Sequence, residues 1–386
     1  MKPSSLASYA FIASLGLALC LLLAGCQTRN QRISINPAVE AALDALQPLV
    51  DSCGIPVFQY CYFSPQGTMH GLVCAQDTTF DMPLPIGEES IFQAASLSKP
   101  LFAYIVMRMV DRGEIDLDTP IAEYTDIDRF EDKEMAQKLT PRIVLSHQTG
   151  LPNWAVSPSS EEWPTSRISF KYPVDSCFAY SGEGYAFLQR AVEAIQGEPL
   201  DDIARREVFE PFDMPTTSYV WQPAYDSIAV PGYNRDGENR GQGRHPRANC
   251  AYTLRTNALE YANFIRRGLL EGEGLSEAAH KEMFTHQVHA QRYADEPRAC
   301  DSPVFWCLGF GAVSQPAGAG ADATAGGEYF WHWGDNGNFK ALWLLHPATK
   351  DGFVYFSNRA TGHDLLDPFL KNLTGDDLPL NDWIRN

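Results

Sequence analysis

A hydroxyl and an amine lie three residues apart in the segment Ser96-Leu97-Ser98-Lys99. The apolar run 101–107 follows and predicts a helix, in which residues i and i+3 share a face. The side chains of Ser96 and Lys99 should therefore meet. A serine becomes a strong nucleophile when a neighbouring base takes its proton, and a desolvated lysine can be that base. The spacing indicates acyl transfer through Ser96; the alternative is a surface serine that only begins a helix.

Two groups of elements must position this pair. Near the N-terminus, residues 38–50 have helical spacing, and two β-rich runs, 55–63 and 69–74, flank a turn at 64–67 and predict a hairpin. The C-terminal part is predicted to contain four strands and a last helix, at 305–313, 329–333, 339–345, 352–357 and 364–370.

Residues 115–250 differ from both groups. They are rich in proline, aspartate and tryptophan, and they contain short helical pieces without sustained alternation of apolar and polar residues. We therefore expect a mostly helical lobe inserted between two parts of one sheet. The predicted fold class is α/β, in the α+β sense: an antiparallel sheet flanked by helices, in one domain that spans residues 39–386.

The first 25 residues are typical of a secretory signal peptide, because Lys2 precedes the apolar run 10–24. The run ends in Leu23-Ala24-Gly25-Cys26, which resembles the lipobox of bacterial lipoproteins. We expect lipidation of Cys26 with palmitate and a polar tether over 26–38; an ordinary signal peptide or an uncleaved anchor are the alternatives. Among such lipoproteins, Gln27 after the cysteine implies an anchor in the outer membrane that faces the periplasm.

The chain carries 30 basic and 48 acidic residues, for a net charge of −18. This balance argues against nucleic acid or an anionic membrane face as a partner, so contact with the membrane is expected only through the lipid anchor. No Cys-x-x-Cys segment occurs, and His280, His286 and His289 lack a supporting carboxylate pattern. No metal or other cofactor is therefore predicted.

Seven of the nine cysteines follow Cys26: Cys53, Cys61, Cys74, Cys177, Cys250, Cys300 and Cys307. An oxidising compartment permits disulfides, and the close spacings predict local bridges within the first three and between the last two. Because seven is an odd number, at least one thiol should stay free or pair between molecules.

Four segments follow the order of motifs in the serine β-lactamase and penicillin-binding-protein superfamily, and the chain resembles its class C-like, esterase and D,D-peptidase branch. They are Ser96-Leu97-Ser98-Lys99 for Ser-x-x-Lys, residues 143–152 for the LLTHTSGLP signature, residues 178–185 in the place of Tyr-x-Asn, and His332-Trp333-Gly334 in the place of Lys/His-x-Gly. The resemblance extends from about residue 50 to the C-terminus. It implies a β-lactamase/transpeptidase-like fold.

The resemblance also implies a mechanism. Ser96 would attack a carbonyl and form an acyl-enzyme that water hydrolyses. Lys99 would take or shuttle the proton, and Tyr180 would be the second acid or base. Two backbone N–H groups, those of Ser96 and Asp335, would bind the oxyanion of the tetrahedral intermediate.

Two residues depart from the pattern of the family. His332, beside Gly334 in the lining of the site, replaces the lysine of true β-lactamases and could bind a carboxylate only when protonated. Gly182 stands where the family has an asparagine whose amide hydrogen-bonds a substrate amide. Both changes shift the expectation towards an ester or another acyl substrate. The adjacent Glu183 is expected to be solvated at a helix start, with a polar substrate contact as the alternative.

A second tyrosine competes with Tyr180, because Tyr261-Ala262-Asn263 spells the Tyr-x-Asn motif literally. It falls inside a predicted amphipathic helix over 258–270, whereas the motif of the family lies in a loop before a helix, as Tyr180 does. We therefore expect Tyr261 to pack in the helix. His147, in the signature loop, is expected to make a structural hydrogen bond.

The sequence predicts a serine hydrolase that acts on a small acyl substrate, either an ester, a β-lactam or a peptidoglycan-like peptide. The activity would be that of an esterase, a β-lactamase or a D,D-peptidase-like enzyme. The alternative is a non-catalytic binding lipoprotein of the cell envelope that keeps the fold. A covalent serine probe separates the two hypotheses, because only an activated Ser96 reacts with it.

Overall fold

The computed structural model describes residues 27–30, 36–76, 80, 85–245, 247–291, 303–314, 327–375 and 377–385. The predicted signal peptide, Cys26 and Cys300 lie outside these residues. Among the helices that are described, none combines the length and the apolar composition needed to cross a bilayer.

The centre of the fold is an antiparallel sheet whose described strands number nine, in the order β1-β3-β2-β11-β10-β9-β8-β7-β6. The strands are β1 (Gln27–Asn30), β2 (Val57–Ser64), β3 (Gly67–Cys74), β6 (Val288–His289), β7 (Val304–Trp306), β8 (Gly311–Ser314), β9 (Glu328–Asp335), β10 (Lys340–His346) and β11 (Asp351–Ser357). The N-terminal hairpin joins the C-terminal strands through the pairing of β2 with β11. The fold class predicted from the sequence is confirmed.

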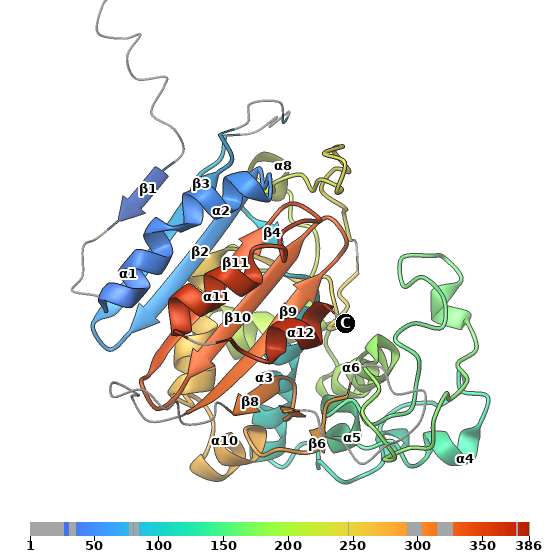
Figure 1. Cartoon of the computed structure of the whole chain (residues 1–386). Helices are drawn as coiled ribbons and strands as arrows, with labels where there is room; N and C mark the ends of the chain where they lie inside the picture. The colour runs from blue at the N-terminus through green and yellow to red at the C-terminus, as the bar shows by residue number, and fades with distance from the viewer. Residues whose placement is uncertain are drawn as a thin grey trace, which may run out of the picture.

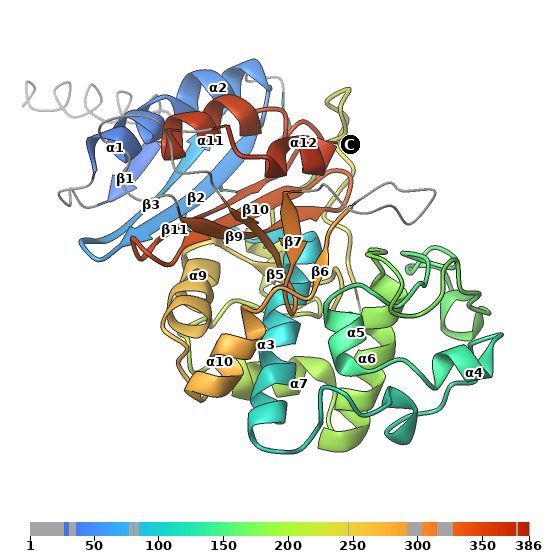
Figure 2. The same cartoon turned by 60° about the horizontal axis from the view of Figure 1, so that its bottom comes forward.

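Helices cover both faces of this sheet, as Figure 2 shows. On one face lie α1 (Pro37–Asp44), α2 (Leu46–Ser52), α11 (Leu366–Thr374) and α12 (Leu380–Arg385). On the other lie α3 (Ser98–Asp111), α9 (Ala258–Asn263), its π-helical continuation η5 (Phe264–Leu270) and α10 (Glu277–Met283). Alternate residues of β2 enter the two apolar cores, since Phe58 and Tyr60 pack on the first face while Cys61 packs on the second.

Two sequence expectations need correction at the edges of the sheet. The single strand predicted over 305–313 is wrong, because β7 and β8 pair with each other around a tight turn. Gly309 in that turn has a φ of 105°, which a residue with a side chain rarely adopts. In addition, β1, which falls within the predicted tether, pairs with β3 at the edge of the sheet.

The inserted lobe is helical, as expected, and lies to one side of the sheet (Figure 1). Its elements are η2 (Ile121–Glu123), α4 (Lys133–Ala136), α5 (Pro141–Leu145), η3 (Trp163–Thr165), α6 (Gly182–Gln196), α7 (Leu200–Ala204), the π-helical η4 (Arg205–Phe209) and α8 (Tyr225–Ile228). The longest helix, α6, begins at the N-cap Ser181, whose Oγ accepts the Gly184 N–H, and ends at Gly197 with a φ of 69°.

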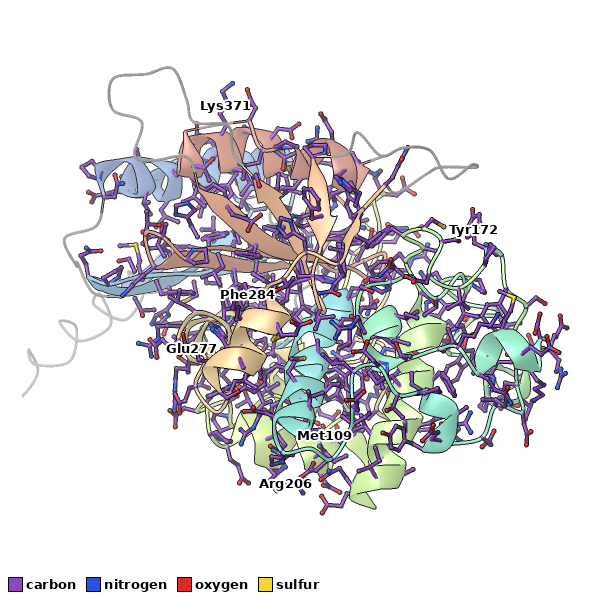
Figure 3. The ribbon with its side chains drawn as sticks, turned by 90° about the horizontal axis from the view of Figure 1, so that it is seen from below. Met109, Tyr172, Arg206, Glu277, Phe284 and Lys371 are labelled. Atoms are coloured by element: carbon purple, nitrogen blue, oxygen red, sulfur yellow. The ribbon has the colours of Figure 1, made fainter. Side chains whose placement is uncertain are left out.

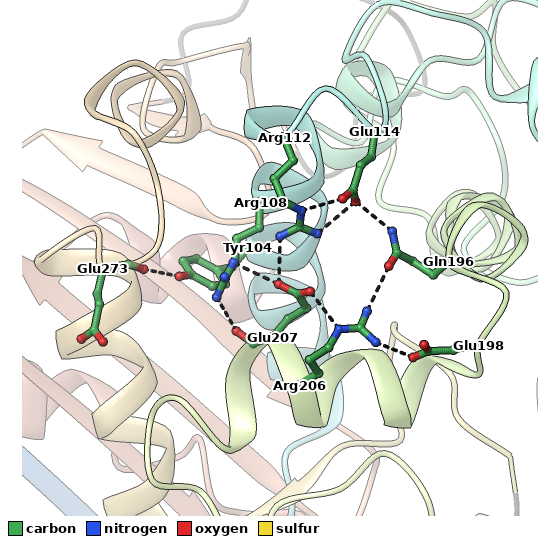
Figure 4. Close-up of polar contacts among 9 residues, drawn as sticks. All are labelled: Tyr104, Arg108, Arg112, Glu114, Gln196, Glu198, Arg206, Glu207 and Glu273. Carbon is green, nitrogen blue, oxygen red and sulfur yellow. Dashed lines mark hydrogen bonds and ion pairs between the residues drawn. The ribbon is translucent and has the colours of Figure 1, made fainter.

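Helix α3 runs through the middle of the molecule, and ion pairs hold its C-terminal end. Seen from below, Met109 of α3 and Arg206 of η4 lie together at one edge of the molecule, and Lys371 of α11 marks the opposite edge (Figure 3). Figure 4 shows the contacts: Arg108 and Arg112 both pair with the Glu207 carboxylate, at 3.1 and 3.0 Å. This end of α3 is thereby fixed to η4, and the other end begins at Ser98, two residues after Ser96.

Candidate active site

Ser96 lies in η1 (Ala95–Leu97), a 3-10 turn that runs directly into α3. The turn follows β4 (Phe92–Gln93), which pairs with β5 (Arg255–Thr256) in a small second sheet. Ala95 has a φ of 49°, in the region that disfavours side chains, so the chain bends sharply before the serine. Ser96 therefore lies at the junction of a strand and the central helix, where two elements fix its position.

Lys99 meets Ser96 as the i, i+3 spacing predicts. Its Nζ lies 3.1 Å from Ser96 Oγ and donates to the Ala251 carbonyl at 2.8 Å. The side chain is buried, and this burial lowers the pKa of Lys99 to about 7. A neutral amine can donate one hydrogen to Ala251 and offer its lone pair to the serine hydroxyl. The geometry and the pKa together suit proton abstraction from Ser96.

Tyr180 is brought to the same pair. The Nζ of Lys99 lies 4.7 Å from the centroid of the Tyr180 ring. Tyr261 behaves differently: it is fully buried in α9, and its hydroxyl donates to the Leu97 carbonyl at 2.8 Å. Tyr261 therefore supports the backbone next to Ser96, and none of its described contacts is with Lys99.

His147 holds the segment that contains Tyr180. Its carbonyl accepts the Ala179 N–H at 2.6 Å, and its Nδ1 accepts the Ser181 N–H at 3.1 Å. Because Nδ1 is an acceptor, the proton of the neutral ring is on Nε2. Burial, and secondly Lys99, keep the pKa of His147 well below its usual value. The structural hydrogen bond expected from the sequence is present, and it acts on the residue next to the tyrosine.

His332 is fully buried on β9, with Nδ1 2.7 Å from the Trp333 carbonyl. The Nδ1–H therefore donates to the backbone, and Nε2 is left as an acceptor. Burial first, and then the proximity of Lys99, place the pKa of His332 well below its usual value. A neutral ring offers no charge to a carboxylate, so the site disfavours the protonated state that carboxylate binding by His332 would need.

Gly334 allows β9 to pass close to η1, the turn that carries Ser96. A Cβ at this position would lie 2.5 Å from the Ala94 carbonyl oxygen, so any side chain would push the strand away. The next residue, Asp335, has its carboxylate tied to Lys340 at 2.5 Å and to the Gly337 N–H at 2.7 Å. Lys340 and the Gly337 N–H thus already bind the carboxylate. The role predicted for Asp335 therefore rests on its backbone N–H.

The burial of Glu183 differs from what the sequence predicts. Instead of being solvated, it is fully buried at the start of α6. Its carboxylate accepts from the Arg129 guanidinium at 3.1 Å, from the Ala155 N–H at 3.0 Å and from Trp163 Nε1 at 2.9 Å. The arginine supplies the charge that makes burial of this carboxylate tolerable. Glu183 joins three loop segments of the lobe to α6.

Gly182 has a neighbour that sequence reasoning missed. A Cβ at this position would lie 2.5 and 2.6 Å from the Cη2 and Cε2 atoms of Trp154. The indole therefore fills the space that the asparagine of the family would need. Gly182 itself could have indicated this contact, because a glycine at the start of a helix often marks a position where another group packs closely.

The predicted disulfides among the first three mature cysteines are wrong, because all six cysteines of the described part of the chain are free. In the β2–β3 hairpin Cys61 faces His70 and Cys74 faces Val57, so the register separates the two thiols. Within the described residues, no group of three or more His, Cys, Asp or Glu side chains is placed to hold a metal ion. His286 instead lies 2.7 Å from the Glu328 carboxylate.

A cavity of about 1090 Å³ lies in the lobe, against α6. Trp163, Phe187, Asn249, Tyr252 and Arg247 are among the residues that line it. Tyr252 directly follows Ala251, the partner of Lys99, and its ring contacts that of Trp154 with centroids 5.6 Å apart. Tyr252 therefore lines the cavity and adjoins the segment that holds Lys99, whereas Ser96, Lys99 and Tyr180 are not among the residues that line it.

The geometry agrees with three comparisons. A family model described as Beta-lactamase matches residues 72–374. The chain is similar to penicillin-binding protein 4 of Amycolatopsis lactamdurans, at 31% identity over 33% of this chain and 35% of that protein. It is also similar to esterase EstB of Burkholderia gladioli, at 35% identity over 18% of each chain. The chain thus matches about a third or less of the length of these curated relatives.

Among solved structures, a class C beta-lactamase is similar with a TM-score of 0.71 and 15% identity, over 88% of this chain and 96% of that one. At this identity the likeness shows the fold alone. The sheet and the inserted lobe are therefore shared with that enzyme, while the substrate must be argued from the site of this chain.

Proposed function

Because this chain belongs to the beta-lactamase family, whose members of this type are serine hydrolases, we propose that it cleaves acyl substrates through an acyl-enzyme at Ser96, with esters preferred. The observation that supports this most directly is the 3.1 Å separation of Ser96 Oγ and Lys99 Nζ. The lysine is buried, and burial lowers its pKa to about 7. A serine next to such an amine is activated at neutral pH.

The proposed reaction has two halves. Lys99 takes the Ser96 proton while Oγ attacks the carbonyl carbon, and the N–H groups of Ser96 and Asp335 bind the oxyanion. Tyr180 and Lys99 pass the proton to the leaving group, whose bond to the carbonyl then breaks. Water attacks the acyl-enzyme with the same groups acting in reverse, and Ser96 is released.

The preference for esters rests on what the site lacks. An amide brings an N–H group that must be hydrogen-bonded when it is buried, and Gly182 offers no side-chain acceptor for it. An ester has no such group. The neutral, buried His332 likewise gives no charge for the terminal carboxylate of a peptide. Secondary amide and D-alanyl peptide substrates, which carry an N–H group, are therefore proposed to be slower than esters with the same acyl group.

The cavity beside Tyr252 is proposed to take the part of the substrate that lies away from the scissile bond. Its volume of about 1090 Å³ is at the upper end of the usual range for ligand pockets. Since aromatic residues such as Phe187 and charged residues such as Arg190 both line the cavity, we propose a bulky substrate group with apolar and polar parts. Small acetyl esters would leave this space empty.

The location of the enzyme is also a proposal. The lipobox-like ending at Cys26 supports a lipid anchor with palmitate, and Gln27 supports an outer-membrane location facing the periplasm. Radiolabelled palmitate should enter the wild-type chain and not Cys26→Ala, and the variant should appear in the soluble fraction. Incorporation of label into Cys26→Ala would refute the anchor.

A fluorophosphonate probe tests the function. The chain without residues 1–26 should be labelled once, at Ser96, while Ser96→Ala should take no label. Enzyme that has not been treated with the probe should hydrolyse p-nitrophenyl esters faster than it hydrolyses nitrocefin, and labelled enzyme should hydrolyse neither. Absence of labelling would favour the non-catalytic binding protein, and faster turnover of nitrocefin would favour a β-lactamase.

A further inference from the structure

We propose that Trp154 determines the substrate class of this enzyme, because its indole replaces a side-chain amide at position 182 with an apolar wall. The proposal rests on the proposed function and names the selectivity of the same site. It predicts aryl and alkyl esters as substrates and predicts discrimination against amides that carry an N–H group.

Trp154 occupies the space that a side chain at position 182 would need. A Cβ at position 182 would lie 2.5 and 2.6 Å from two atoms of the indole, well inside van der Waals contact. The ring is the rigid body of a side chain, not a flexible end that could swing away. With Trp154 in place, no residue other than glycine fits at position 182.

The position of Trp154 is fixed from both sides. The preceding residue, Asn153, accepts the Gly182 N–H through its side chain at 2.9 Å and the Glu183 N–H through its carbonyl at 3.0 Å. The following residue, Ala155, donates its N–H to the buried Glu183 carboxylate at 3.0 Å. The loop that presents the indole is therefore tied to the first turn of α6 on either side of the tryptophan.

Neighbouring rings hold the indole in orientation. Trp154 makes edge-to-face contacts with Trp163 and Tyr252, with centroids 5.9 and 5.6 Å apart. Trp163 in turn donates its Nε1–H to Glu183. Such contacts favour one ring orientation. The buried Glu183 thus helps to hold the Trp154 indole through two hydrogen bonds, one from the Ala155 N–H and one from Trp163 Nε1.

The wall borders the reacting groups. Gly182 is two residues from Tyr180, and Tyr252 follows Ala251, whose carbonyl holds Lys99. Trp154 contacts Gly182 and Tyr252, one from each of these two segments, and the proposal places the acyl group of Ser96 against its ring. Ring carbons accept no strong hydrogen bond, so the N–H of a bound amide would lose its water without replacement. An apolar acyl group, by contrast, gains buried contact.

Four proteins test the proposal: the wild type, Trp154→Ala, Gly182→Asn and the double variant. Each is assayed with an ester and an anilide that share one acyl group. The wild type should prefer the ester beyond the intrinsic reactivity difference. Gly182→Asn alone should be poorly folded because of the overlap. In the double variant the anilide-to-ester ratio of kcat/KM should rise on the order of 10- to 100-fold above that of Trp154→Ala.

A second readout uses esters only. The wild type should favour phenylacetyl over acetyl p-nitrophenyl esters, and Trp154→Ala should reduce this preference about tenfold, because the apolar contact is lost. Trp221→Ala is the control, since the ring contacts of that indole are with Tyr225, Arg244 and Arg255 and not with Trp154 or Gly182. It should leave the preference unchanged.

The outcomes separate this proposal from the proposed function. If the wild type takes no fluorophosphonate at Ser96, the hydrolase itself is refuted. If Trp154→Ala is labelled at the wild-type rate and keeps the phenylacetyl preference, the role of Trp154 is refuted while the hydrolase stands. A folded double variant whose anilide-to-ester ratio equals that of Trp154→Ala would overturn the proposal in the same way.

Discussion

The imidazole of His147 lies against the phenol ring of Tyr180, with the centroids 4.2 Å apart and the planes inclined by 32°. The same histidine binds the backbone on both sides of the tyrosine, at Ala179 and at Ser181. It has a φ of 58°, in the left-handed region. A backbone conformation of this kind persists only where the surrounding contacts stabilise it.

Variants of His147 should separate the hydrogen bond from the ring contact. Asparagine tolerates the left-handed region and can accept the Ser181 N–H, whereas phenylalanine keeps a ring but leaves that N–H buried and unpaired. We expect His147→Asn to lower kcat about tenfold and His147→Phe to lower it more, with KM little changed. In a Tyr180→Phe background neither change should lower kcat further. An additive loss in that background would show a general defect of folding instead.

The pH dependence should report on Lys99. Burial lowers its pKa from the usual 10.5 to about 7, so kcat/KM should rise with pH through about 7 as the amine becomes neutral. Between about pH 7 and 10.5 the unfolded state binds more protons at this lysine than the native state does. The free energy of unfolding should therefore increase with pH across that window.

Lys99→Met isolates this contribution from the other titrating groups. The variant should be inactive and should gain stability relative to the wild type, most at pH 6 and least at pH 10. Melting temperatures of both proteins across this range measure the difference. A difference that does not depend on pH would contradict a lowered pKa for Lys99.

Gly334→Ala should disable the site while leaving the sheet intact. The added Cβ would meet the Ala94 carbonyl at 2.5 Å and force β9 away from the nucleophile turn. The N–H groups proposed for the oxyanion would then separate, at a cost on the order of 100-fold in kcat. Gly337→Ala is the control: its φ of 75° disfavours alanine, but no atom lies within 4 Å of the new Cβ. It should cost stability without a comparable loss of kcat.

Glu207→Gln should weaken the far end of α3. Arg108 and Arg112 both pair with this carboxylate, whose side chain is 8% exposed. Since the arginines are 22% and 35% exposed, the loss should fall below that of a fully buried pair, at about 2 kcal/mol. Chemical denaturation measures it. Asp226→Asn removes an exposed pair with Arg244 and should cost well under 1 kcal/mol.

The parts of the site that follow from local spacing could be predicted from the sequence. Ser96 and Lys99 meet because they are one helical turn apart, and β2 and β3 form a hairpin because turn residues separate two β-rich runs. Each of these predictions needs only the geometry of one element. The distant motifs at Tyr180 and His332 were placed by their order along the chain.

The features that sequence reasoning missed depend on partners far away in the chain. Glu183 is buried because Arg129, 54 residues earlier, neutralises it. Trp154 lies on Gly182 because the lobe folds its loop back onto α6. The disulfide prediction relied on close spacing, but the register of the hairpin turns Cys61 and Cys74 to different partners. Spacing along the chain does not determine such contacts.

The pairing of β2 with β11 gives this protein a particular order of assembly. The side chain of Asn358 accepts the Val57 N–H, across 301 residues, and β9 with His332 and Gly334 also comes late in the chain. Contacts at such separations form slowly. During synthesis from the N-terminus, the lobe and α3 can fold before the last strands have been made. Ser96 acquires its proposed oxyanion site only after β9 has joined the sheet. The moment at which Ser96 first reacts with a covalent label during synthesis would therefore show when the whole sheet is complete.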